Sequence, residues 1–238
     1  MRQFTLTLFF FSTLFLCTAL FAEDSCHPAI DPSRAQYIVG YGSLMNENSV
    51  KQTDAYAGPN IPIELFGFQR RWGVVPQRSK FEMYVGIIQR PNQLMNASLF
   101  RLSQPEVLSQ FDNRENGYCR QSVESSSLRV LINEKNPSGQ YWLYIPHNHL
   151  FRYPSDKSPI SQAYVDVFLS GCIAMDEKYN LTGFAKQCIL TTTEWHPSWS
   201  NNRQPARRAF VTKSDMKKVD ALLKEMLLTL YEKLHITQ

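Results

Sequence analysis

Runs rich in β-branched and aromatic residues fill the first two thirds of the chain, whereas runs with helical spacing fill the last third. The first kind predicts strands, because turn-forming Gly, Pro and Asn separate the runs. We expect strands over residues 36–41, 63–72, 83–89, 97–102, 118–124, 128–132 and 141–145.

The apolar positions of the last third recur at three- and four-residue intervals, as on one face of a helix. They predict helices over 161–175 and 181–193 and a final helix capped by Ser214, whose apolar face packs against the sheet. A short helix capped by Ser103 is expected between the strands. Strands followed by helices favour one α+β domain, over residues 36–238.

The first residues have the pattern of a secretory signal. Arg2 precedes a long apolar run, and small residues precede Glu23 and Asp24. We expect residues 1–22 to be a signal peptide that is cleaved near Ala22, with an uncleaved anchor as the alternative. The protein would then be secreted or periplasmic, with no membrane contact after cleavage.

The charge and the cysteines limit the classes of partner and site. A formal net charge of +4, with no basic run interleaved with aromatics, argues against a nucleic-acid partner. Four cysteines follow the expected signal, which permits two disulfides in an oxidising compartment but leaves their pairing open. No spacing of Cys and His suits a zinc site, so no metal is expected. The four cysteines are Cys26, Cys119, Cys172 and Cys188.

Residues 37–46, YIVGYGSLMN, end a strand-forming run in the glycines Gly40 and Gly42. Glycine in a strand adds backbone entropy and no side-chain packing. The backbone therefore either turns sharply here or lets a ligand come close.

Residues 111–120, FDNRENGYCR, place Glu115 where the short helix passes into the next strand, beside Gly117. Loops at such junctions often carry functional groups on a rigid scaffold. The carboxylate could be catalytic, or it could simply pair with Arg114.

Together, Tyr-Gly-Ser-Leu at 41–44 and Arg-Glu-x-Gly-Tyr at 114–118 resemble the γ-glutamylcyclotransferase family. Further segments are similar to the family in the same order, so that the resemblance spans residues 36–210. These segments are GFQRRWGV (67–74), YVDVFLSGC (164–172), FAKQCILTTTEW (184–195) and PSWSNNRQPARR (197–208).

The resemblance implies a small mixed β-barrel flanked by helices, with a cavity at its mouth. It also implies an activity, the release of 5-oxoproline from γ-glutamyl amides by attack of the substrate's own α-amine, without cofactor. Glu115 carries over as the general acid and base, and the loop that holds the γ-glutamyl group is Tyr41, Gly42, Ser43 and Leu44. Tyr118 is expected to line the same pocket.

The reaction suits such residues. A protonated α-amine must lose a proton before it attacks, and the leaving nitrogen must gain one. One carboxylate near both nitrogens can do both, if burial raises its pKa. Intramolecular attack supplies proximity without a nucleophile or metal.

Two other hypotheses stand beside this one. An exported, non-catalytic module of the same fold would bind γ-glutamyl or acidic ligands, and a thiol hydrolase would use Cys119 as a free thiolate. The leaving group stays open, because glutathione metabolism is mainly intracellular whereas the expected signal directs export. The sequence leaves the oligomeric state open as well.

Overall fold

The computed structural model describes residues 26–76, 82–203 and 211–236, so the expected signal peptide lies outside the described residues. The strands are β1 (Gln36–Gly40), β2 (Ile61–Val74), β3 (Tyr84–Arg101), β4 (Tyr118–Val123), β5 (Leu128–Val130), β6 (Gln140–Pro146), β7 (Ile160–Ser161), β8 (Thr192–Thr193) and β9 (Trp199–Ser200). The α-helices are α1 (Glu47–Lys51), α2 (Leu108–Arg114), α3 (Gln162–Tyr179), α4 (Phe184–Leu190), α5 (Lys213–Met226) and α6 (Leu228–Ile236).

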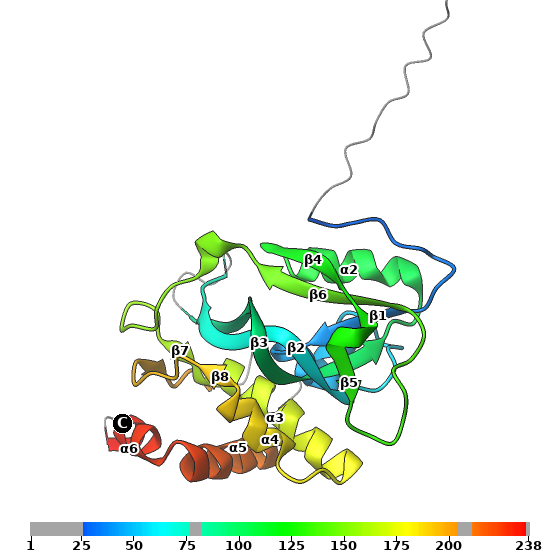
Figure 1. Ribbon diagram of the computed structural model, residues 1–238. Helices are drawn as coiled ribbons and strands as arrows, with labels where there is room; N and C mark the ends of the chain where they lie inside the picture. The colour runs from blue at the N-terminus through cyan, green and yellow to red at the C-terminus, as the bar shows by residue number, and fades with distance from the viewer. Residues whose placement is uncertain (1–25, 77–81, 204–210, 237–238) are drawn as a thin grey trace, which may run out of the picture.

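The strands β1–β6 and β8 form one mixed sheet in the order β4-β6-β1-β3-β2-β5, with β8 paired to β2 (Figure 1). The central β1 is parallel to β6 and antiparallel to β3. A barrel would require β4 to pair with β5, and no pairing joins these two strands in the described part of the chain. The α+β class with flanking helices is confirmed, whereas the expected barrel is an open sheet.

All five residues of β1 are buried, which shows that both faces of the sheet are covered there. Alternation along the strand turns Tyr37 and Val39 to one apolar cluster, which α3, α4 and α5 complete. Ile38 turns to a second cluster, which α1 and α2 complete. Helices α3 to α5 lie together below the sheet in Figure 1, and α2 lies at its upper side beside β4 and β6.

Two of the expected strands, 83–89 and 97–102, are parts of the single long strand β3. The turn signal between them, which contains Pro91, lies where the β2–β3 register shifts between Phe66 and Phe68. Gly67 supplies the positive φ of +85° that this irregularity needs. Proline is tolerated there because no regular ladder hydrogen bond is lost.

The helix α3 is capped by Ser161, whose side chain accepts a hydrogen bond from the Tyr164 N–H (3.3 Å). The next helix is shorter than expected, since α4 begins only after Gly183, at a φ of +87°.

The final helical stretch differs in three ways from the expectation. It consists of two helices, α5 and α6, and its cap is Thr212 in a capping box with Asp215, so the predicted cap Ser214 is wrong. Its apolar face packs mainly on α3 and α4, whereas the expected partner was the sheet. Similarly, Ser103 caps no helix, because the chain enters α2 through a 3-10 turn, Pro105–Val107, with no side-chain cap.

Two disulfides link distant elements. Cys26–Cys119 joins the N-terminal segment to β4, and Cys172–Cys188 joins α3 to α4. None of the helices in the described residues has the length and apolarity required to cross a membrane.

Candidate active site

The candidate site lies just beyond the end of β1, where the chain turns at the glycines noted above. A Cβ atom at Gly40 would lie 2.6 Å from Ser98 Oγ and 2.7 Å from the Leu44 carbonyl oxygen. No side chain fits in that space, so glycine lets the backbone reverse tightly into a 3-10 turn, Ser43–Met45.

Gly42 is required for a second close approach, by a side chain from α3. A Cβ there would overlap the hydroxyl of Tyr164 and lie 2.9 Å from Val85 Cγ2. The Tyr164 hydroxyl accepts a hydrogen bond from the backbone N–H of Ser43 (3.2 Å). The turn therefore directs the Ser43 N–H into the pocket, where it donates to the Tyr164 hydroxyl.

Glu115 lies at the C-terminal cap of α2, and its N–H donates to the Phe111 carbonyl (2.8 Å). Its own carbonyl accepts from the Tyr118 N–H (3.0 Å), which closes a turn through Gly117. Gly117 has a φ of +96°, a conformation that favours glycine. This turn sends the Glu115 side chain to the wall of the pocket.

The carboxylate of Glu115 is largely buried, with 18% of its side chain exposed. Burial raises its pKa, and the Arg114 guanidinium, whose Nε lies 3.3 Å from Glu115 Oε1, acts in the opposite direction. Glu115 thus pairs with Arg114 and still has a raised pKa. The pairing and a catalytic role are therefore compatible.

Arg114 also connects Glu115 to the glycine turn. Its Nη2 donates to Ser43 Oγ (3.3 Å) and Ser49 Oγ (2.8 Å), and its Nη1 donates to the Ser49 carbonyl (2.6 Å). Nη1 also donates to Thr53 Oγ1 (3.0 Å), so four hydrogen bonds fix the guanidinium and, with it, the carboxylate that it contacts.

All six residues singled out from the sequence line this one pocket. They are Tyr41, Gly42, Ser43, Leu44, Glu115 and Tyr118. The sequence reasoning missed four other lining residues, Val39, Val85, Tyr144 and Tyr164. Tyr164 belongs to the helical stripe of α3, and this pattern does not distinguish a pocket residue from a core residue.

The pocket is nearly filled by its own tyrosines. Its volume is about 20 Å³, which is room for roughly one water molecule. Tyr164 stacks on Tyr84 with ring centroids 4.4 Å apart. Burial raises the pKa of Tyr164 and Tyr118, and the nearby Glu115 carboxylate adds to both shifts, so these phenols stay protonated.

Tyr41 braces the pocket from behind. Its hydroxyl donates to the Tyr144 carbonyl (2.8 Å), and its own carbonyl accepts from Arg70 Nη1 (3.1 Å). Arg70 is fully buried, and burial lowers its pKa to about 9. Its other donors are also used, for example by Asn96 Oδ1 (2.8 Å) and Thr192 Oγ1 (2.7 Å), so this cation anchors the turn and does not reach the pocket.

Cys119 is joined to Cys26 and is not a free thiolate, so the thiol-hydrolase hypothesis is wrong for this structure. Within the described residues, one group has metal-ligating atoms close together: Cys26, Cys119 and His147, within 4.8 Å of one another. Metal ligation needs thiolates, and both sulfurs are used in the disulfide.

Comparison with solved structures shows the fold. One similar structure is a γ-glutamyl cyclotransferase, with a TM-score of 0.51 and 12% identity over 79% of this chain and 99% of that one. Another is an uncharacterized protein from Homo sapiens, with a TM-score of 0.51 and 14% identity over 78% of this chain and 98% of that one. No protein-family model matches the sequence, and no curated protein matches it. At this identity the likeness shows the γ-glutamylcyclotransferase-like fold alone.

Proposed function

We propose that the protein is a γ-glutamylcyclotransferase that releases 5-oxoproline from γ-glutamyl amides and acts outside the cytosol. The observation that carries the proposal is the largely buried Glu115 carboxylate, beside a glycine turn that directs the Ser43 N–H into the same pocket. The two disulfides are compatible with an extracellular location.

Glu115 would move both protons. Its carboxylate takes a proton from the substrate's α-ammonium group, and the freed amine attacks the γ-carbonyl carbon. The new C–N bond closes a five-membered lactam as the old C–N bond breaks, and protonated Glu115 gives its proton to the leaving nitrogen. The lactam nitrogen loses its second proton to the regenerated carboxylate, which passes it to the released amine as that amine leaves. The cycle consumes no water, and the raised pKa of Glu115 suits both its roles.

The substrate would displace the Tyr164 hydroxyl. A pocket of about 20 Å³ admits a ligand of several heavy atoms only when a lining side chain moves. The Tyr164 hydroxyl is the group that accepts the hydrogen bond of the Ser43 N–H. When Tyr164 moves, that N–H becomes available to an oxygen of the γ-glutamyl group.

The experiment measures 5-oxoproline released by residues 23–238 and by the Glu115→Gln variant. The substrates are glutathione, γ-glutamyl-alanine and γ-glutamyl-ε-lysine, which together identify the leaving group. Glutamine is nearly isosteric, so a folded variant that binds substrate but releases nothing supports the proton-transfer role of Glu115.

Calorimetry on the same panel tests the alternative. If the wild-type protein binds these compounds and releases no 5-oxoproline, the catalytic proposal fails and an exported binding module of the same fold takes its place.

A further inference from the structure

A larger groove lies apart from the candidate site and shares none of its lining residues. Its volume is about 630 Å³, within the range of ligand-binding pockets. Neighbouring residues on β4 and β6 divide between the two sites: Tyr118 and Tyr144 line the candidate site, whereas Cys119 and Ile145 line the groove. Adjacent side chains of a strand point to opposite faces, so the two sites lie on opposite faces of this pair of strands.

One wall of the groove is a free strand edge. β3 pairs with β2 over Tyr84–Gln89, but it pairs with β1 only over Ser98–Arg101. In the part of the chain that the structure describes, no strand pairs with the second edge of β3 at Ile87 and Ile88. Backbone N–H and C=O groups on such an edge are a template for another strand.

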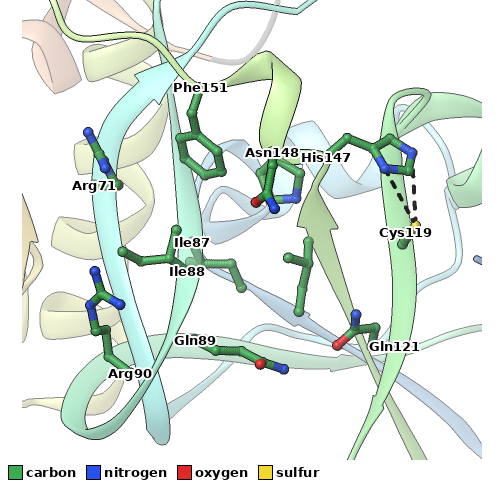
Figure 2. A pocket seen from close by; sticks show the side chains of 12 residues that line it. Arg71, Ile87, Ile88, Gln89, Arg90, Cys119, Gln121, His147, Asn148 and Phe151 are labelled. Atoms are coloured by element: carbon green, nitrogen blue, oxygen red, sulfur yellow. Dashed lines mark hydrogen bonds between the residues drawn. The ribbon is translucent and has the colours of Figure 1, made fainter.

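Four consecutive residues of β3, 87–90, line the groove. Ile87 is fully buried, so the accessible part of the edge is residues 88–90, about 10 Å of extended chain. On the opposite wall, β6 pairs with β1 and β4 and, within the described residues, with no part of this edge. Figure 2 shows Ile87 and Ile88 in the middle of the groove, between two more polar walls.

The charged side chains that line the groove are arginines. Arg71 and Arg90 lie on the same wall in Figure 2, and none of the described Asp and Glu side chains lines the groove. The Arg71 guanidinium lies over the Phe151 ring. Its Nη2 is 3.9 Å from Glu194 Oε1, at the outer limit of an ion pair. Arg90 is exposed and makes no ion pair with any described residue.

We propose that the groove binds an extended acidic peptide, which adds as a strand to the free edge of β3. Backbone hydrogen bonds to residues 88–90 hold the chain, apolar side chains lie on Ile88 and Ile145, and a carboxylate meets Arg71 and Arg90. A free edge several residues long favours a peptide over a small anion. The proposal concerns a different site from Glu115 and does not depend on the proposed reaction.

The test uses fluorescein-labelled pentapeptides of alternating valine and threonine, with aspartate at each position in turn and with a free or amidated C-terminus. Two matched peptides accompany the tightest binder, one with lysine for aspartate and one N-methylated at alternate residues. Fluorescence anisotropy measures their affinity for the purified protein. Arg90→Glu is the test variant, and Arg101→Glu is the control, because Arg101 is an exposed arginine of the same strand outside the groove.

We expect an acidic peptide to bind, and Arg90→Glu to weaken it about tenfold while Arg101→Glu leaves it unchanged. The lysine and N-methylated peptides should bind the wild-type protein at least as weakly as the acidic peptide binds Arg90→Glu. Hydrogen exchange should slow within residues 88–90 when the acidic peptide is bound. Failure of every acidic peptide to bind at millimolar concentration overturns the proposal. Equal binding of the N-methylated peptide, or equal binding to Arg90→Glu, also overturns it.

Discussion

Burial and the neighbouring Arg114 act in opposite directions on the pKa of Glu115, the proposed acid and base of the candidate site. Burial favours the neutral carboxyl group, and the guanidinium favours the carboxylate. The net shift raises the pKa, so the basic form is present above that pKa and is lost as the pH falls through it. The same guanidinium contacts Ser43, which couples the charge of Glu115 to the position of the turn.

Two replacements of Arg114 should separate the effect of its charge on the pKa of Glu115 from the effect of its hydrogen bonds on the position of the turn. Arg114→Met removes the influence that lowers the pKa of Glu115, so the acid limb of the kcat/KM profile should move to higher pH. Arg114→Lys keeps the charge but loses the hydrogen bonds to Ser43 and Ser49, so the limb should stay while kcat/KM falls about tenfold. An unchanged acid limb in the methionine variant would show that Arg114 does not control this carboxyl group.

The residue scale is also where the sequence is most informative. Glycine at 40, 42 and 117 marks places where the backbone tolerates no side chain. A close contact explains the first two, and a positive φ explains the third. Tyr144 and Tyr164 reach the pocket from elements far along the chain. Their places follow from tertiary packing, for which a single sequence offers no local signal.

Among the elements, the turn after β1 and helix α3 meet at the pocket, through Tyr164. The Tyr164 hydroxyl lies against Gly42 and takes the Ser43 N–H, so the helix and the turn close the site together. Under the proposed function, a γ-glutamyl substrate has to separate them.

This contact predicts a pair of coupled substitutions. Tyr164→Phe frees the Ser43 N–H and should lower KM about fivefold, the worth of one hydrogen bond. Gly42→Ala should abolish most activity, because its methyl group overlaps the Tyr164 hydroxyl, and adding Tyr164→Phe should restore part of it. Tyr179→Phe, on the same helix but bonded to the Asn60 carbonyl, is the control. Strictly additive effects of the two substitutions would contradict this contact.

The elements also show where sequence reasoning stops. The strands over 118–124 and 141–145 and the helix after Ser161 were expected and are present. The last helix divides at Leu227, where neither glycine nor proline marks a break. Whether the sheet closes depends on long-range pairing of β4 and β5, which no local pattern specifies.

Over the whole molecule, the sheet opens beyond the end of β1. β6 and the first half of β3 continue past that end, and no strand of the described ranges lies between them. Both the Glu115 pocket and the larger groove lie there. Disulfides hold the surrounding parts, one next to Tyr118 through Cys119 and the other between α3 and α4.

The two disulfides should stabilise the fold unequally. Cys26–Cys119 spans 93 residues and Cys172–Cys188 spans 16. By chain entropy, paired Cys→Ala substitutions should lower the free energy of unfolding by about 4–5 kcal/mol for the first and about 3 kcal/mol for the second. Urea unfolding followed by circular dichroism measures both. The reverse order would show that native-state contacts at α3 and α4, and not loop closure, dominate.

The most direct test of the account follows the fate of γ-glutamyl-alanine in water enriched in the heavy oxygen isotope. Cyclisation predicts alanine and 5-oxoproline in equal amounts with no heavy oxygen incorporated, since no water takes part. Glu115→Gln should lose this activity, and Glu106→Gln, an exposed carboxylate replaced just before α2, should keep it. Isotope-labelled glutamate as the product, or 5-oxoproline formed equally by Glu115→Gln, would contradict the account.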